Sequence, residues 1–143
     1  MKDNLSDIGK IIKTKREKDL HLPVASESVE QQCLFRWAQY ESGKYPELDL
    51  MFHIPNGGKR NITTAVRLKA EGVKSGVPDI NLPVARGEFH GLFIELKKQR
   101  GNKTTENQDA WLEALNKQGY MAIVCKGWEE ASKAILNYLE GLE

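Results

Sequence analysis

Segments with helical periodicity and segments with strand periodicity follow one another along this chain in an order that few folds accommodate. Apolar residues that recur every three to four positions predict helices over 28–42, 63–72, 105–119 and around 131–139. Apolar stretches bounded by Gly and Pro predict strands over 50–55, 79–84, 91–97 and 120–125. The order helix, strand, short helix, strand, strand, helix, strand, helix predicts an α/β (α+β) fold, in which helices cover a mixed sheet.

The connections indicate how the predicted strands pair. Strands 79–84 and 91–97 are separated only by a short return at Gly87, which favours an antiparallel pair. The last strand follows a helix, and a right-handed crossover through that helix places it parallel to strand 91–97.

Capping sequences and apolar spacing predict where the helices begin and which faces they bury. Capping boxes occur at Ser28–Gln31 and Thr105–Gln108, and Thr63 or Thr64 is expected to cap the short helix. The inward stripe of the first helix is predicted to consist of Val29, Cys33, Trp37 and Tyr40, flanked by Leu34. That of the last helix is predicted to consist of Ala131, Ile135, Tyr138 and Leu139.

A length of 143 residues with 40% hydrophobic residues suits one ordinary globular core. We expect one domain over residues 27–143, preceded by a polar N-terminal arm over residues 1–26. Cys33 and Cys125 show neither a CxxC spacing nor a Cys/His cluster, so a disulfide framework or a structural zinc site is not supported. No apolar run approaches the roughly 18 residues of a membrane span, and the charged N-terminus is unlike a secretory signal. The sequence therefore predicts a soluble protein of a reducing cytoplasm.

Positive charge gathers in the middle of the chain, although the formal net charge is only +1. Residues 53–103 contain ten Lys and Arg against four Asp and Glu, and the remainder contains eleven against sixteen. A basic region concentrates a polyanion near one face even of an almost neutral protein, although plain solvated surface has the same composition.

The residues most suggestive of chemistry lie on the second and third predicted strands. The two-residue period of the third strand places Glu95 and Lys97 on one face. Pro78 precedes Asp79 at the start of the neighbouring strand, so antiparallel pairing brings the Asp79 carboxylate beside Glu95. These two carboxylates and a backbone carbonyl, that of Leu96, are the hard oxygen ligands that Mg²⁺ prefers and Mn²⁺ also accepts. Lys97 is then placed to orient a metal-bound water or to neutralise charge in the transition state, although any half-exposed strand alternates in this way.

Two polar residues are predicted to point inward from the helices. Glu30 has Cys33, Leu34 and Trp37 at positions i+3, i+4 and i+7, so its carboxylate shares the apolar side of the first helix. Gln108 occupies the same place relative to Trp111, Leu112 and Leu115 in a later helix. Each can be a capping or boundary residue, but the two together suggest convergence on the site of the strand residues.

The strand residues and these helix residues together resemble a known signature. Gly76–Asp79 followed by Ile94–Lys97 is similar to the motif of the PD-(D/E)xK nuclease superfamily, whose core order of helix, three strands, helix and strand matches the predicted elements. Within it, the chain resembles the VRR-Nuc family, the virus-type replication and repair nucleases, over about residues 27–126. The resemblance to this family lies in Glu30 with Gln31, in His53–Arg60 and in Gln108.

The resemblance implies catalytic or supporting roles for Glu30, Asp79, Glu95, Lys97 and Gln108, with the metal on Asp79 and Glu95. It also implies a Mg²⁺-dependent endonuclease that acts as a homodimer on branched DNA, such as four-way (Holliday) junctions, and a bacterial or phage origin. The preference for branched DNA follows from the resemblance alone.

Phosphate contacts are expected around the glycine-rich turn after the first strand, because glycines let backbone N–H groups approach a ligand closely. The candidate DNA-binding residues of this turn, the following helix and the end of the third strand are His53, Asn56, Lys59, Arg60, Arg67, Lys98 and Arg100. His53 can also be a base or simply the exposed residue of an alternating strand.

Other functions remain compatible with the sequence. These are a non-catalytic DNA-binding module on a nuclease fold, a flap nuclease or exonuclease, and a hydrolase of a small phosphorylated molecule. The last predicts a closed pocket and no steep salt dependence of binding. For a dimer interface, the candidate apolar residues lie around Ile62–Leu68 or at Ile11 and Ile12 in the arm.

Overall fold

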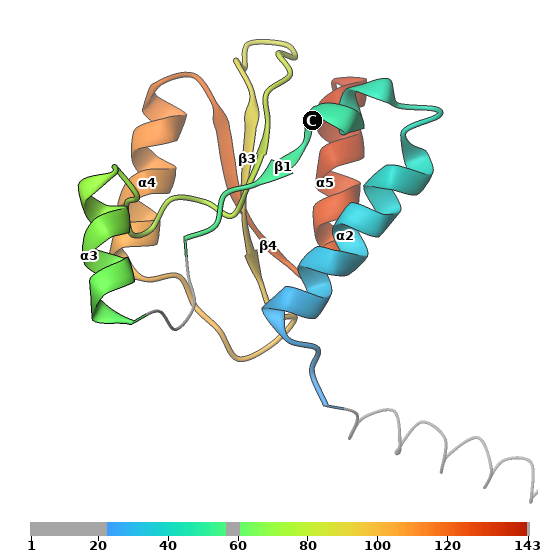
Figure 1. Cartoon of the computed structure of the whole chain (residues 1–143). Coiled ribbons are helices and arrows are strands. Elements are labelled where there is room, and N and C mark those ends of the chain that lie inside the picture. The colour runs from blue at the N-terminus through green and yellow to red at the C-terminus, as the bar shows by residue number, and fades with distance from the viewer. Residues whose placement is uncertain (1–22, 57–60, 143) are drawn as a thin grey trace, which may run out of the picture.

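A four-stranded mixed sheet forms the centre of the molecule (Figure 1). The structure, a computed structural model, describes residues 23–56 and 61–142. The strands are β1 (Phe52–His53), β2 (Ile80–Leu82), β3 (Leu92–Lys97) and β4 (Met121–Lys126), in the spatial order β1-β2-β3-β4. β2 is antiparallel to both β1 and β3, whereas β4 is parallel to β3. Both predicted pairings are therefore confirmed.

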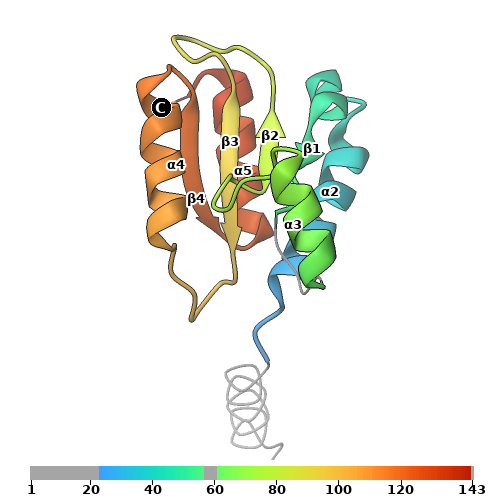
Figure 2. The same ribbon diagram turned by 60° about the vertical axis from the view of Figure 1, so that its left-hand side comes forward.

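Helices cover both faces of this sheet, as predicted. They are α2 (Glu27–Glu41), α3 (Ile62–Ala70), α4 (Glu106–Lys117) and α5 (Trp128–Glu140). α2 packs against α5 on one side of the sheet, and α4 packs against β4 on the other (Figure 1). α3 lies on the same side as α4, in front of the sheet in Figure 2.

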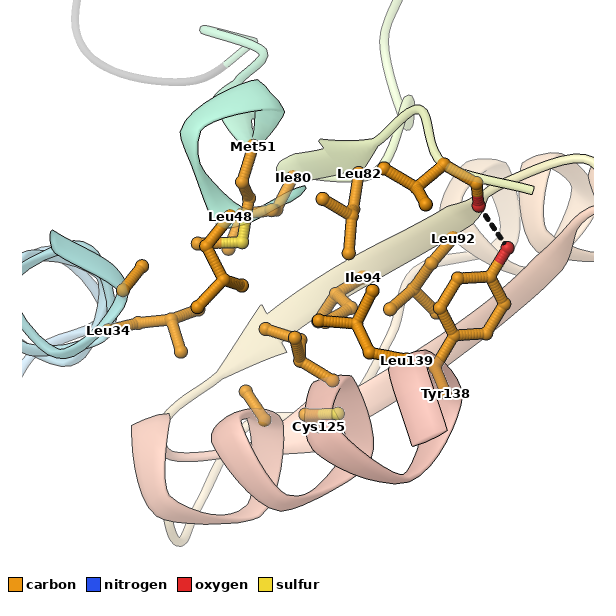
Figure 3. Packing of buried hydrophobic residues seen from close by; sticks show 14 of the residues in the cluster. Leu34, Leu48, Met51, Ile80, Leu82, Leu92, Ile94, Cys125, Tyr138 and Leu139 are labelled. Carbon is orange, nitrogen blue, oxygen red and sulfur yellow. Dashed lines mark hydrogen bonds between the residues drawn. The ribbon is translucent and has the colours of Figure 1, made fainter. Parts of the chain in front are cut away.

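The main hydrophobic core lies between the sheet and the α2–α5 pair (Figure 3). Leu34 from α2, Ile80 from β2 and Ile94 from β3 all belong to this layer. The Tyr138 hydroxyl on α5 donates a hydrogen bond to the Val84 carbonyl just beyond β2 (Figure 3). The predicted inward residues of α5 are confirmed, because each is buried: Ala131, Ile135, Tyr138 and Leu139.

The prediction for the first helix is right for Glu30 and Leu34, but it is wrong for Val29 and Tyr40 and for the cap. The buried residues of α2 are Glu30, Leu34 and Ala38, whereas Val29 is 47% exposed and Tyr40 is 86% exposed. The residues that face the core are spaced i, i+4 and i+8, because α2 packs against α5 and β3 through the narrow strip that these three side chains form. The N-cap is Ser26, whose side chain accepts a hydrogen bond from the Val29 N–H, so the helix begins before the predicted cap at Ser28.

The first predicted strand, 50–55, is mostly not a strand. Pro46–Leu50 forms a 3-10 helix, η1, and only Phe52–His53 pairs with β2. Proline at the start of η1 favours this turn, which points Leu48 into the core. The cap of α3 is also corrected, because the Asn61 side chain rather than Thr63 or Thr64 accepts the hydrogen bond from the Thr64 N–H.

The remaining elements differ from their predicted bounds by a few residues at most. The predicted capping box of α4 is confirmed, with Thr105 and Gln108 bonded reciprocally. In the described ranges, no helix is long and apolar enough to span a membrane. The predicted arm before residue 27 lies outside the described residues except for 23–26, as do Ile11 and Ile12. The domain boundary therefore stays a prediction.

Candidate active site

Two charged side chains of β3 are buried side by side. Glu95 is only 2% exposed and Lys97 only 6% exposed. They alternate with Ile94 and Leu96, which belong to the hydrophobic core, so the two-residue period places both charges on the opposite face. The Lys97 Nζ atom lies 3.3 Å from the Glu95 Oε1 atom. The structure thus brings the predicted carboxylate and amine together as a buried ion pair.

Asp79 lies directly before β2 and reaches across to β3. Its Oδ2 atom accepts a hydrogen bond of 2.8 Å from the Leu96 N–H. On the other side of the chain, the Asp79 carbonyl accepts hydrogen bonds from the Ile54 N–H and the His53 Nδ1 atom. The side chain of Asp79 is therefore held over the end of β3, next to Glu95.

Gln108 joins this pair from α4. Its Nε2 atom donates a hydrogen bond of 2.8 Å to the Glu95 Oε1 atom. The Oε1 atom of the same Gln108 accepts from the Thr105 N–H in the capping box. Capping therefore fixes the orientation of the amide, so that its nitrogen faces the carboxylate.

The second oxygen of Glu95 has no such partner. Within the described residues, the Glu95 Oε2 atom is a buried side-chain oxygen with no hydrogen bond. A buried, unpaired carboxylate oxygen costs free energy unless another ligand binds it. This atom marks the place where the site can accept a positive charge.

The electrostatics of the carboxylate pair favour a bound cation. Burial, and then the nearby Asp79 carboxylate, raise the pKa of Glu95 to about 7, although Lys97 lowers it. Burial also raises the pKa of Asp79, against the hydrogen bond from the Leu96 N–H, and the Glu27 carboxylate adds to the increase. A cation bound between the two carboxylates would favour their charged forms.

Glu30 is buried as the sequence predicts, but its hydrogen bonds lead away from the carboxylate pair. Its Oε2 atom accepts from the Trp128 N–H at the start of α5, at 2.7 Å. Its Oε1 atom accepts from the Gln99 side chain at 3.0 Å. Among the described residues, Glu30 has neither a hydrogen bond nor an ion pair with Asp79, Glu95 or Lys97. These contacts join α2 to the N-terminus of α5, which favours a negative charge.

Glu27 is a site residue that the sequence reasoning missed. Its Oε1 atom lies 3.9 Å from the Lys97 Nζ atom and accepts a hydrogen bond from the Asn102 side chain. Its i, i+3 spacing to Glu30 could have indicated that both carboxylates lie on one side of the helix. Periodicity alone could not show which of the two points towards β3.

A cavity of about 380 Å³ opens beside these residues. It is lined by Glu27, Ser28, Gln31, His53, Pro55, Asn56, Asp79 and Leu96. His53 is held through its Nδ1 atom, and the Asn56 side chain is held by the Val77 carbonyl. Two predicted DNA-binding residues, His53 and Asn56, therefore lie at the mouth of the carboxylate site.

Of the basic residues predicted to contact DNA, three lie in the described part of the chain. Arg67 on α3 is exposed and forms an ion pair with Glu71 at 3.2 Å. Lys98 is half-buried and Arg100 is exposed, in the segment that follows β3. Lys59 and Arg60 lie outside the described residues.

The mixed sheet carries a half-buried Asp beside a buried Glu and Lys at the junction of two antiparallel strands, and a helix glutamine is bonded to the Glu. This arrangement defines a nuclease-type domain of the PD-(D/E)xK plan. The profile of the VRR-NUC domain matches residues 16–129, so the chain belongs to the VRR-NUC family. A solved structure described as a VRR_NUC domain protein is 33% identical to this chain, with a TM-score of 0.72. The match covers 82% of this chain and 91% of that one. No curated protein is significantly similar to the chain.

Proposed function

We propose that this nuclease-type domain is a Mg²⁺-dependent endonuclease that hydrolyses phosphodiester bonds in branched DNA, such as four-way junctions, with Mn²⁺ as an alternative ion. The observation that carries the proposal is the unpaired, buried Glu95 Oε2 atom beside the Asp79 carboxylate. Both groups supply the oxygen ligands that Mg²⁺ prefers.

The donor set fits a magnesium ion that keeps several waters. In the described part of the chain, no group of three or more His, Cys, Asp and Glu is placed to hold a metal together. Asp79 and Glu95 would therefore be the direct side-chain ligands, with the Leu96 carbonyl beside them, and Glu27 would act through water. Magnesium is commonly bound by one or two carboxylates, with water and phosphate oxygens completing an octahedron.

The chain's own residues would divide the remaining work. The bound ion supplies a water of lowered pKa and polarises the phosphate. Gln108 and Lys97 hold the Glu95 Oε1 atom, so the Oε2 atom would be left to ligate the ion. Lys97 orients the attacking water or neutralises charge that develops on the phosphate oxygens. The cavity mouth with His53 and Asn56 receives the DNA backbone.

The first test is the metal-dependent cleavage of labelled DNA by matched carboxamide variants. Asp79→Asn and Glu95→Gln are expected to reduce the cleavage rate at least a hundredfold, because each removes a ligand charge with little change in shape. Glu88→Gln in the β2–β3 turn is the control and should cut at the wild-type rate. Binding of DNA should survive in both site variants. Near-normal turnover in Glu95→Gln would rule out the proposed site.

The substrate preference is tested with linear, flap and four-way-junction DNA of equal length, with and without Mg²⁺. Preferred nicking of the junction supports the proposal. Preferred cutting of flaps or ends supports a flap nuclease or exonuclease, and salt-dependent binding of DNA without any cleavage supports a non-catalytic module. We place this activity in the cytoplasm of a bacterium or of a phage-infected cell, where reduced thiols such as Cys33 and Cys125 are stable.

A homodimer is the second part of the proposal. Resolution of a four-way junction requires two nicks related by a twofold axis, and a C2 dimer supplies two sites with that symmetry. α3 supports it, since none of its residues is buried and its Ile62 and Val66 are 83% and 64% exposed. These two residues lie one turn apart on one face of the helix.

Light scattering at micromolar concentration measures the oligomeric state. The double variant Ile62→Lys/Val66→Lys is expected to be monomeric, whereas Tyr40→Lys, which changes an exposed apolar residue on α2, should remain dimeric. A monomeric wild-type chain that still cuts both strands of a junction in one binding event would contradict the dimer.

A further inference from the structure

The direction of the backbone groups at the end of β3 bears on the metal site. In a strand, the N–H and C=O of one residue point to the same side, and successive residues alternate. The Lys97 carbonyl accepts from the Gly127 N–H, so Lys97 points its backbone groups towards the β4 side. Leu96 must point its groups the other way, and its N–H does donate to Asp79. The Leu96 carbonyl therefore faces the side of Asp79.

The residue that would normally bind this carbonyl is a proline. Ile94 pairs with Ile80 in the antiparallel ladder of β2 and β3. Two further steps in this register place Pro78 opposite Leu96. A residue at that position would donate its N–H to the Leu96 carbonyl, but proline has no N–H. The described part of the chain shows no side-chain or turn donor on this carbonyl either.

We propose that Pro78 is a positioning residue, which ends the ladder at Ile80 and thereby leaves the Leu96 carbonyl free as an oxygen ligand for the metal. This inference rests on the proposed function, because it concerns the same ion. Leu96 and Asp79 line the same cavity, so an ion bound there could take both the free carbonyl and the carboxylate as ligands. The Asp79 side chain accepts from the Leu96 N–H, and the missing N–H of Pro78 leaves the carbonyl of the same residue to the metal.

A purely structural role for Pro78 has different consequences. Pro78 is among the most buried residues of the molecule, so it could serve only to fill the core and to stiffen the turn. In that case, replacing it would lower stability and leave metal affinity per folded molecule unchanged. If Pro78 keeps the Leu96 carbonyl free, replacing it with a residue that has a backbone N–H would weaken metal binding in the folded protein.

The first experiment measures the binding of Mn²⁺ alone to the full chain by calorimetry, without DNA. Pro78→Ala is expected to bind Mn²⁺ roughly 10- to 100-fold more weakly, the range seen when partners around a metal site are changed. Pro83→Ala controls for the loss of a proline near β2. Val84→Ala controls for the loss of buried side-chain volume beyond the other end of β2. Both should keep wild-type affinity. Wild-type affinity in folded Pro78→Ala would overturn the inference.

The second experiment uses the wild-type protein, so it does not depend on the folding of a variant. Titration with Mg²⁺ is followed by the ¹³C resonances of backbone carbonyls and side-chain carboxyls. Shifts of the Asp79 and Glu95 carboxyls together with the Leu96 carbonyl are expected, with the Leu82 carbonyl as an unshifted reference. Carboxyl shifts without a Leu96 shift would overturn the inference and leave the proposed metal site intact. No binding of either ion would overturn the proposed function, and this inference with it.

Discussion

Gln108 and Glu95 are joined by a hydrogen bond of 2.8 Å between a helix cap and a buried strand carboxylate. The same Gln108 side chain also closes the capping box of α4 through its oxygen. One residue thus serves the start of a helix and the candidate active site at the same time. The two roles can be separated, because a capping box accepts Glu as well as Gln at this position.

Gln108→Glu is therefore expected to keep α4 folded and to impair the site. The new carboxylate still accepts from the Thr105 N–H but places a negative charge against Glu95. We expect a fall of at least tenfold in the cleavage rate with circular dichroism unchanged. Gln118→Glu makes the same change at the far end of α4 and should leave cleavage unaffected. Equal rates for the two variants would contradict a role for Gln108 in the site.

Glu27 and Glu30, the glutamates in the first turn of α2, should respond in opposite ways to the same substitution. Glu30→Gln removes a buried charge and leaves one acceptor oxygen for two donors, the Trp128 N–H and the Gln99 side chain, at a cost of about 2–3 kcal/mol of stability. Glu27→Gln leaves stability nearly unchanged, because this side chain is partly exposed, but removes a charge beside Lys97. Urea unfolding and calorimetric titration with Mn²⁺ measure the two effects. A loss of metal affinity in Glu30→Gln alone would support the predicted catalytic role of Glu30 and contradict this assignment.

Stability without metal should fall as the pH rises. The pKa of Glu95 is raised from an ordinary value of 4.5 to about 7, so between these values the folded protein holds a proton that the unfolded chain has released. The free energy of unfolding therefore decreases with pH across this window, by at most about 3 kcal/mol, and levels off above it.

Glu95→Gln is the matched control for this pH effect, because its amide mimics the protonated acid and does not titrate. Thermal unfolding is measured in the presence of a chelator from pH 5 to 8. The melting temperature of Glu95→Gln should increase relative to that of the wild type as the pH rises. Added Mg²⁺ should reduce this difference at pH 8, because the ion binds the charged carboxylates. A difference independent of pH would show that Glu95 titrates normally.

The basic residues beyond β3 are predicted to contact DNA phosphates. Lys98→Ala/Arg100→Ala should flatten the plot of log affinity against log salt by roughly 0.9 for each phosphate that is no longer neutralised. Lys117→Ala/Lys133→Ala removes two exposed charges from α4 and α5 and should not change the slope. Arg67→Ala tests the same idea on α3. Unchanged slopes in both Lys98→Ala/Arg100→Ala and Arg67→Ala would show that the DNA follows another surface.

Local pattern was sufficient to determine the order of the elements, the strand pairings and the shared face of Glu95 and Lys97. The reason is that strand alternation, capping boxes and short returns act between residues close in sequence. The burial of Glu30 also followed from its helical spacing to Leu34. The same local reasoning failed for the strand at 50–55, where Pro46 begins a 3-10 helix instead.

Only the tertiary structure decided which partner each buried polar group has. Glu30 bonds to Trp128, 98 positions away, while Glu27 one turn earlier approaches Lys97. The outcome depends on how α2 rotates and docks against α5 and β3, which is set by the packing of the whole core. Periodicity shows that a side chain points inward, but the group that it meets there belongs to another element, and its position depends on contacts between residues far apart in the sequence.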